Sequence, residues 1–94
     1  MEKRIGVVAV VIQNRESAKT FNSILGEFHD MILGRQGLPL HARNLHVISL
    51  IVEGTTDEIG AMTGKIGRLA GVQVRSVLTK GDTDERRNSL ENLH

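Results

Sequence analysis

Two stretches of this chain repeat one pattern of apolar and polar positions. The first begins with the apolar residues 5–12, continues through an amphipathic stretch and reaches Gly34-Arg35. The second begins with the apolar residues 47–52 and reaches Gly67-Arg68 and Val72 in the same way. Short continuous apolar runs predict strands, and apolar residues at three- and four-residue steps predict amphipathic helices. Two successive strand–helix–strand units therefore predict an α+β domain with the element order βαββαβ.

The apolar spacing and the capping residues predict where the two helices lie. Asn14 or Ser17 can cap the start of the first helix, and Gly34 can end it. The second helix opens at Thr55, whose spacing to Glu58 is that of a capping box. The expected core faces are Ala18, Phe21, Ile24, Leu25, Phe28, Met31 and Ile32 in the first helix, and Ile59, Met62, Ile66 and Leu69 in the second.

The polarity of each strand predicts its place in the sheet. Residues 5–12 and 47–52 are apolar at almost every position, which is typical of central strands. Residues 32–40 contain two glycines and Pro39, and residues 72–77 include polar side chains, as edge strands do. We therefore expect an antiparallel sheet with the strand order 4-1-3-2, the order of a ferredoxin-like fold.

One face of this sheet is expected to lack a cover. Two helices can cover only one face, so the other face should be polar. Instead, Val7, Val11 and Ile51 alternate with an equally apolar set of residues on the same two strands. We expect a second subunit to pack on this face, in a homo-oligomer that is a dimer or a tetramer. The alternative is a long edge segment that folds over the sheet.

Length and composition favour one small domain, residues 1–80, followed by a polar tail, residues 81–94. A chain of 94 residues is a marginal size for standing alone, since it buries roughly 60–65% of its unfolded surface. The net charge of +1 shows no bias toward nucleic acid or membrane. No apolar stretch reaches the roughly 18 residues of a membrane span, and no signal-peptide pattern opens the chain. We expect a cytoplasmic protein.

Three glycines in the second helix form a further pattern. Gly60, Gly64 and Gly67 fall on one face at about 100° per residue, nearly opposite the core stripe. Each glycine costs a helix interior about 1 kcal/mol relative to alanine, so the pattern favours a close neighbour, either another helix or a ligand. The alternative is that a well-buried helix tolerates these glycines without a functional reason.

Three segments carry a resemblance to a known family, namely residues 3–11, 32–39 and 63–72. In their order and spacing they resemble the family of small proteins assigned as regulators of the iron-only hydrogenase system, over residues 1–80. That family is similar to the ACT-like C-terminal domain of nickel-responsive repressors, without their ribbon-helix-helix part. The resemblance implies an ACT-like, regulatory, oligomeric domain that is not an enzyme.

ACT-like domains usually hold effectors near the loop after the first strand, here residues 13–17. Backbone amides at the start of the first helix could hold a carboxylate or phosphate, with an arginine supplying charge. Cations beside the glycine face could do the same, although most such side chains are simply solvated. The candidate ligand-binding residues are Asn14, Arg15, Ser17, Arg35, Gly64, Lys65 and Arg68.

Metal binding, catalysis and nucleic-acid binding are disfavoured. The repressor-type nickel site needs a cysteine, and this chain has none; its histidines, His29, His41, His46 and His94, lack the spacing of a ligand pair. We predict no metal and no cofactor. There is no nucleophile elbow or tight acid–base cluster, and the two phenylalanines lie on the expected helix core face, which leaves no aromatic residue to stack bases.

The sequence thus predicts a homo-oligomeric regulatory domain that binds a small ligand or a protein partner. One alternative is a purely structural assembly module. A third possibility is a small enzyme that uses the subunit interface as its pocket.

Overall fold

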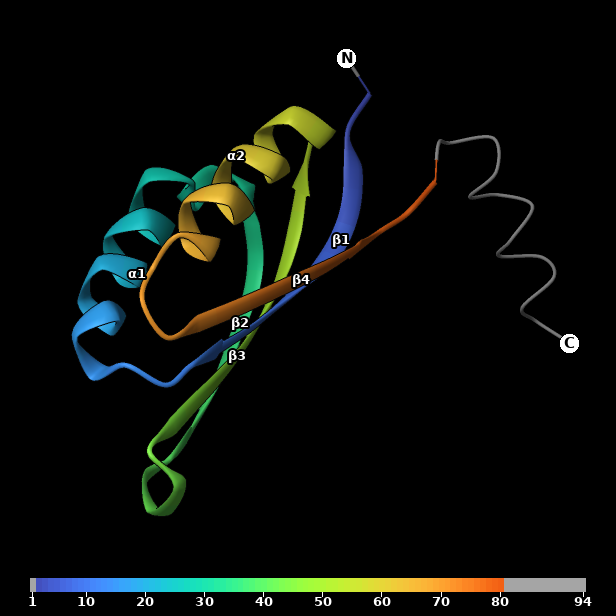
Figure 1. Ribbon diagram of the computed structural model, residues 1–94. Helices are drawn as coiled ribbons and strands as arrows, with labels where there is room; N and C mark the ends of the chain where they lie inside the picture. Colours follow the sequence, from blue (N-terminus) through green and yellow to red (C-terminus); the bar gives the residue numbers. More distant parts are fainter. Residues whose placement is uncertain (1, 81–94) are drawn as a thin grey trace, which may run out of the picture.

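The computed structural model describes residues 2–80, which form the expected βαββαβ arrangement (Figure 1). Residues 81–94, expected to be a polar tail, lie outside the described residues, as does His94. The elements are β1 (Arg4–Ile12), α1 (Arg15–Glu27), a 3-10 turn (His29–Met31), β2 (Ile32–Leu40), a second 3-10 turn (His41–Arg43), β3 (Leu45–Gly54), α2 (Thr56–Gly67) and β4 (Val72–Leu78).

The four strands form one antiparallel sheet in the order β2-β3-β1-β4. Counted from the β4 edge, the same order reads 4-1-3-2. The two continuous apolar strands, β1 and β3, are the central pair, and they align without a break from Arg4 opposite Gly54 to Ile12 opposite His46. The strand that contains Pro39 lies at an edge of the sheet. Proline has no N–H to donate, and at an edge this does not cost the sheet a hydrogen bond between central strands. The register of this edge strand shifts between Ile32 and Gly34.

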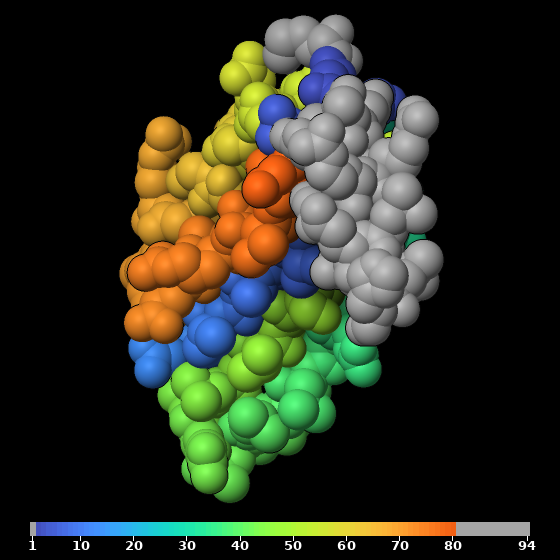
Figure 2. Space-filling view, turned by 90° about the vertical axis from the view of Figure 1, so that its right-hand side faces the viewer, coloured from blue at the N-terminus to red at the C-terminus, as the bar shows by residue number. Residues whose placement is uncertain are grey.

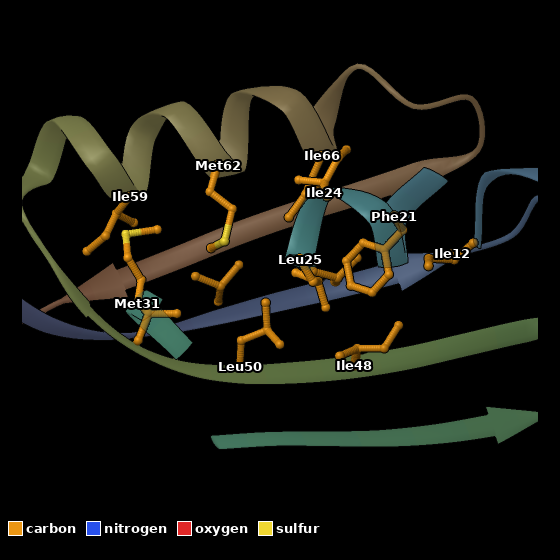
Figure 3. Packing of buried hydrophobic residues seen from close by; sticks show 13 residues of the cluster. Ile12, Phe21, Ile24, Leu25, Met31, Ile48, Leu50, Ile59, Met62 and Ile66 are labelled. Atoms are coloured by element: carbon orange, nitrogen blue, oxygen red, sulfur yellow. The ribbon is translucent and has the colours of Figure 1, made fainter. Parts of the chain in front are cut away.

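Both helices lie on the same face of the sheet, and the core fills the space between them and the strands (Figure 1). Figure 3 shows side chains of α2 directed toward side chains of β3, with Phe21 of α1 beside them. The burial of these apolar surfaces is the main stabilisation of the domain. The buried core consists of Val8, Val10, Ile12, Phe21, Ile24, Leu25, Met31, Ile48, Leu50, Val52, Ile59, Met62 and Ile66.

Local hydrogen bonds fix the start of each helix. Asn14 caps α1, since its side-chain oxygen accepts a hydrogen bond from the Glu16 N–H at 2.9 Å. The capping box expected at α2 is confirmed: the Thr55 N–H donates to Glu58 at 2.8 Å, and the Glu58 N–H donates to the Thr55 hydroxyl at 3.1 Å. Both starts therefore follow from residues adjacent in sequence.

The expected end of the first helix is wrong. Helix α1 stops at Glu27, with Phe28 as its C-cap, and the 3-10 turn His29–Met31 follows. Gly34 does not end a helix; it lies in β2, opposite Ile51. The 3-10 turn keeps Met31 buried in the core, so the apolar pattern continues past the end of the α-helix and hides it from a sequence-based prediction.

Candidate functional site

The face of the sheet opposite the helices, termed the open sheet face, is largely apolar. Exposed fractions of 44% for Val7, 40% for Ile51 and 74% for Val77 show that it is uncovered at these positions. The pairing register places these three side chains in one row across β3, β1 and β4. Figure 2 views this face, on which β4, β1, β3 and β2 follow one another from orange through blue to green. Among the described residues, the open sheet face comprises Ile5, Val7, Ala9, Val11, Gln36, Leu38, Val47, Ser49, Ile51, Glu53, Gln73, Arg75 and Val77.

A pocket of about 130 Å³ lies on the other side of the sheet, where the helices leave it uncovered. The β2–β3 hairpin projects beyond the start of α1 (Figure 1), so its helix-side residues have no helix above them. His46, opposite Pro39, is one of these residues. The pocket, termed the basic pocket, is lined by Ile12, Gln13, Arg15, Ala18, Pro39, His41, Asn44, Leu45 and His46.

Three basic side chains from three different elements line the basic pocket. Arg15 is the first residue of α1, His41 opens the second 3-10 turn, and His46 lies in β3. Within residues 2–80, no acidic residue lines the pocket, and none of these three side chains has a hydrogen-bond or ion-pair partner. The arrangement can therefore supply several unpaired donors to one bound group.

The imidazole of His46 lies against the backbone of the edge strand. A Cβ atom placed on Gly37 would come within 3.2 Å of His46 Nε2, which is closer than most such contacts. Glycine at this position therefore leaves room for the ring, and His46 is half-buried. Restricting the ring in this way fixes one wall of the pocket.

Of the candidate residues at the start of the first helix, one lines the basic pocket. Asn14 uses its side chain to cap α1. Ser17 is buried, and its hydroxyl donates to the Ala70 carbonyl at 2.7 Å, which ties α1 to the loop before β4. Arg15 alone of this group lines the pocket.

The other candidate cations lie elsewhere. Arg35 donates to the Asn22 side chain at 2.9 Å, and its guanidinium lies 5.8 Å from the centre of the Phe21 ring. Lys65 pairs with Glu27 at 2.8 Å and so bridges the two helices. The seven residues are therefore distributed over several regions, with Gly64 exposed on α2 and Arg68 exposed at its C-cap.

Of the three glycines of α2, two face open space and one does not. A Cβ atom on Gly60 or Gly64 would meet nothing within 4 Å. Gly67 differs, because its Cβ would lie 3.3 Å from Cγ1 of Val74 in β4. The expectation that all three glycines share a face nearly opposite the core is wrong for Gly67, since the last turn of α2 approaches the sheet.

The three histidines of residues 2–80 do not all lie together. His29 is exposed and pairs with its neighbour Asp30 at 3.1 Å, whereas His41 and His46 share the basic pocket. Across residues 2–80, no three side chains of the His, Cys, Asp or Glu types are grouped as a metal site requires. In the same range, no helix is both long enough and apolar enough to cross a membrane.

Comparison with known proteins identifies the family. Residues 4–76 match the family model described as "TM1266-like: Iron-only hydrogenase system regulator, putative". The chain belongs to the TM1266-like family. Its resemblance to regulators of the iron-only hydrogenase system, inferred from three short segments, is thereby confirmed. No curated protein matches this TM1266-like chain significantly.

Solved structures agree with this placement. The uncharacterized protein TM1266 from Thermotoga maritima is 34% identical to the chain, with a TM-score of 0.80, and the match covers 84% of this chain and 100% of that one. A protein of unknown function from Galdieria sulphuraria is 16% identical, with a TM-score of 0.60, and the match covers 84% of this chain and 46% of that one. The second similarity concerns the fold alone.

Proposed function

We propose that this TM1266-like chain is a cytoplasmic, non-enzymatic regulatory domain that assembles with itself through the open sheet face and binds a small ligand. The description of the family as an iron-only hydrogenase system regulator supports the regulatory part of this proposal. The resemblance to ACT-like domains supports the combination of assembly and effector binding. The single observation that carries the proposal is the row of exposed apolar side chains Ile51, Val7 and Val77.

The composition of the open sheet face favours a second copy of this chain as its partner. Among the described residues the face holds two charged side chains of opposite sign, Glu53 and Arg75, and no aromatic residue, so it offers little to a nucleic acid. A two-fold contact places the same surface on both sides, so each apolar row meets apolar side chains of the partner. Burial of exposed valine and isoleucine side chains then drives the association.

The size of the face also suits such a contact. Four strands about 4.8 Å apart, with the nine residues of β1 rising about 3.4 Å each, span roughly 19 by 30 Å, or about 570 Å² in projection. Stable dimers bury about 800 Å² of accessible surface per partner, and the accessible area of ridged side chains exceeds their projected area. The face is therefore of the scale that a stable dimer uses.

The test is the mass of the full chain in solution. Light scattering at micromolar concentration should give a dimer or tetramer for the wild type, and Val77→Glu should lower the mass. Val77 is 74% exposed, so a charge there leaves the monomer fold intact. Thr20→Glu, which adds the same charge at an exposed position of α1, is the matched control and should keep the wild-type mass.

A monomeric wild type would refute the assembly. Because the chain contains no cysteine, Val7→Cys introduces a unique thiol at the centre of the face. A short bifunctional thiol reagent should then link two copies. Absence of linked copies in a sample of dimer mass would show that the chains associate through another surface.

A purely structural assembly module is the second candidate, and one observation favours it. Four of the candidate ligand-binding residues already make contacts within the chain, namely Asn14, Ser17, Arg35 and Lys65. A thermal-shift screen of amino acids, nucleotides and divalent metals separates the two functions. If no compound shifts the melting temperature, the assembly module is the better interpretation.

A further inference from the structure

We propose that the basic pocket binds a small organic or inorganic anion through its oxyanion group. The proposal specifies the ligand class within the small-ligand half of the proposed function and rests on that half alone. The geometry that carries it is the convergence of Arg15, His41 and His46 on one cavity of about 130 Å³.

The charge of the pocket wall selects for anions. Of the nine lining residues in the described range 2–80, three are basic and none is acidic. Arg15, His41 and His46 have no ion-pair partner within residues 2–80, in contrast to Lys65, which is paired with Glu27. Donors that lack an acidic partner are well satisfied by a carboxylate or phosphate, and the planar guanidinium of arginine can contact two oxygens of either.

The positive end of α1 reinforces the same preference. Arg15 is the first residue of this 13-residue helix, so the helix dipole adds partial positive charge to the wall that carries the guanidinium. The amide side chains of Gln13 and Asn44 complete the rim, and each has an N–H group that can donate to an oxygen. Anion-binding groups thus come from both sides of the cavity.

Size and lining restrict the rest of the ligand. About 130 Å³ is below the roughly 300 Å³ at which pockets for drug-sized ligands begin, so the ligand is small. Ile12, Ala18 and Leu45 give the pocket an apolar part that suits a short carbon chain. Within the described residues, no phenylalanine, tyrosine or tryptophan lines the pocket. Inorganic phosphate and short carboxylic acids fit these limits.

A cation or a metal ion fits less well. In the described part of the chain, a cation at the pocket wall would meet three basic groups and no carboxylate. A transition metal would find the two imidazoles of His41 and His46 but no third ligand of the usual protein types in this part of the described chain. An anion is the ligand class that the three basic side chains favour, and the amide N–H groups of Gln13 and Asn44 can donate to it as well.

The test is a titration of the full chain, labelled with ¹⁵N and followed by NMR, with inorganic phosphate and separately with succinate. Succinamide, which has the same carbon chain without the charges, is the ligand control. We expect saturable shifts of the amide signals of Gln13, Arg15 and Asn44 with phosphate, with succinate or with both. The arm that binds tells phosphate from carboxylate, and succinamide should give no saturable shift.

Variants of the pocket wall test the residues. Arg15→Gln and His46→Gln should each raise the dissociation constant at least about 5-fold, because each removes a donor to a charged group. Arg43→Gln is the matched control: Arg43 is an exposed cation in the turn that contains His41, but it does not line the pocket. This control should change the dissociation constant less than about 2-fold, because it removes no donor from the pocket.

Three results would overturn the proposal. The first is no saturable shift by either anion at millimolar concentration, and the second is a shift centred away from the pocket. The third is an equal loss in Arg15→Gln and Arg43→Gln, which would indicate diffuse surface charge. Because the two glutamine variants change different elements, a folding defect in one leaves the other as the test. Light scattering of the same samples tests the assembly independently of the anion binding. A monomeric chain that still binds phosphate would refute the proposed oligomer and support the proposed anion site.

Discussion

Two glycines of α2 give a sharp test of what surrounds this helix. Gly60 and Gly64 lie within the helix Thr56–Gly67, and a Cβ atom on either would meet nothing within 4 Å. If the surroundings of α2 are those of a single domain, alanine fits at both positions without a clash. The perturbation is therefore the double variant Gly60→Ala, Gly64→Ala.

The expected gain follows from helix propensity. Alanine is favoured over glycine by about 0.8–1.0 kcal/mol in a helix interior, because glycine loses more backbone freedom on folding. The two sites together should raise the free energy of unfolding by about 1.6–2.0 kcal/mol. For a domain of this size, each kcal/mol shifts the melting temperature by about 4–8 °C, so the rise should be about 6–16 °C.

The assay is thermal and urea unfolding of the wild type and the variant at one chain concentration, since association also raises the melting temperature. Gly67→Ala is the matched control within the same helix. Its Cβ would lie 3.3 Å from Val74 Cγ1, so crowding offsets the propensity gain and the control should gain less than half as much per site.

A double variant that is no more stable than the wild type would refute this reasoning. Such a result would mean that another chain or a ligand lies close to the glycine pair. The variant Gly64→Leu then shows whether this neighbour is a ligand or another chain. Loss of ligand-induced thermal stabilisation with assembly intact points to a ligand, whereas dissociation of the oligomer points to a helix contact.

Two further predictions concern the ends of α2. The pKa of Glu58 lies below its ordinary value of 4.5, chiefly because the Thr55 backbone N–H donates to its carboxylate. The stability that this shift contributes is present above pH 4.5 and is lost as the pH falls through the lowered pKa. Thermal melts should therefore show that any excess of the wild-type melting temperature over that of Glu58→Gln at pH 7 becomes smaller toward pH 3. Gly71→Ala should lose at least about 1–2 kcal/mol in urea unfolding, because Gly71 has φ +67° and a Cβ there would lie 2.8 Å from Cβ of Asn14; unchanged stability would contradict that geometry.

Local patterns predicted the strands and the helix starts, but not every helix end. The capping box of Thr55 and Glu58 depends on residues three apart, so it is visible in the sequence. The end of α1 depends on a 3-10 turn that keeps Met31 in the core while the chain changes direction. An apolar residue in such a turn has the same spacing as one in a continuing helix, so the sequence pattern predicts a helix that runs on to Gly34.

The basic pocket could not be predicted from spacing at all. His41 and His46 are five residues apart, which fits neither one helix face nor one strand face. They meet because the turn at His41–Arg43 ends in a left-handed Asn44, with φ 55°, and because the pairing register places His46 opposite Pro39. Arg15 joins them from a distant part of the sequence. Arg15 is a candidate because it lies at the start of the first helix. No pattern in the sequence predicts that the hairpin lies beside it.

The two-sided apolar character of β1 raises the question of what fixes its alignment with its neighbours. A strand with one polar face is held in register by burial, but β1 would bury apolar side chains after a one-residue slip as well. Gly6 supplies the missing constraint: a Cβ there would collide with the Leu78 side chain and lie 2.8 Å from the Val77 carbonyl oxygen. A slip of β1 against β4 would bring Ile5 or Val7 to that position, where neither fits. One glycine thus selects a single alignment for a strand whose hydrophobicity permits two.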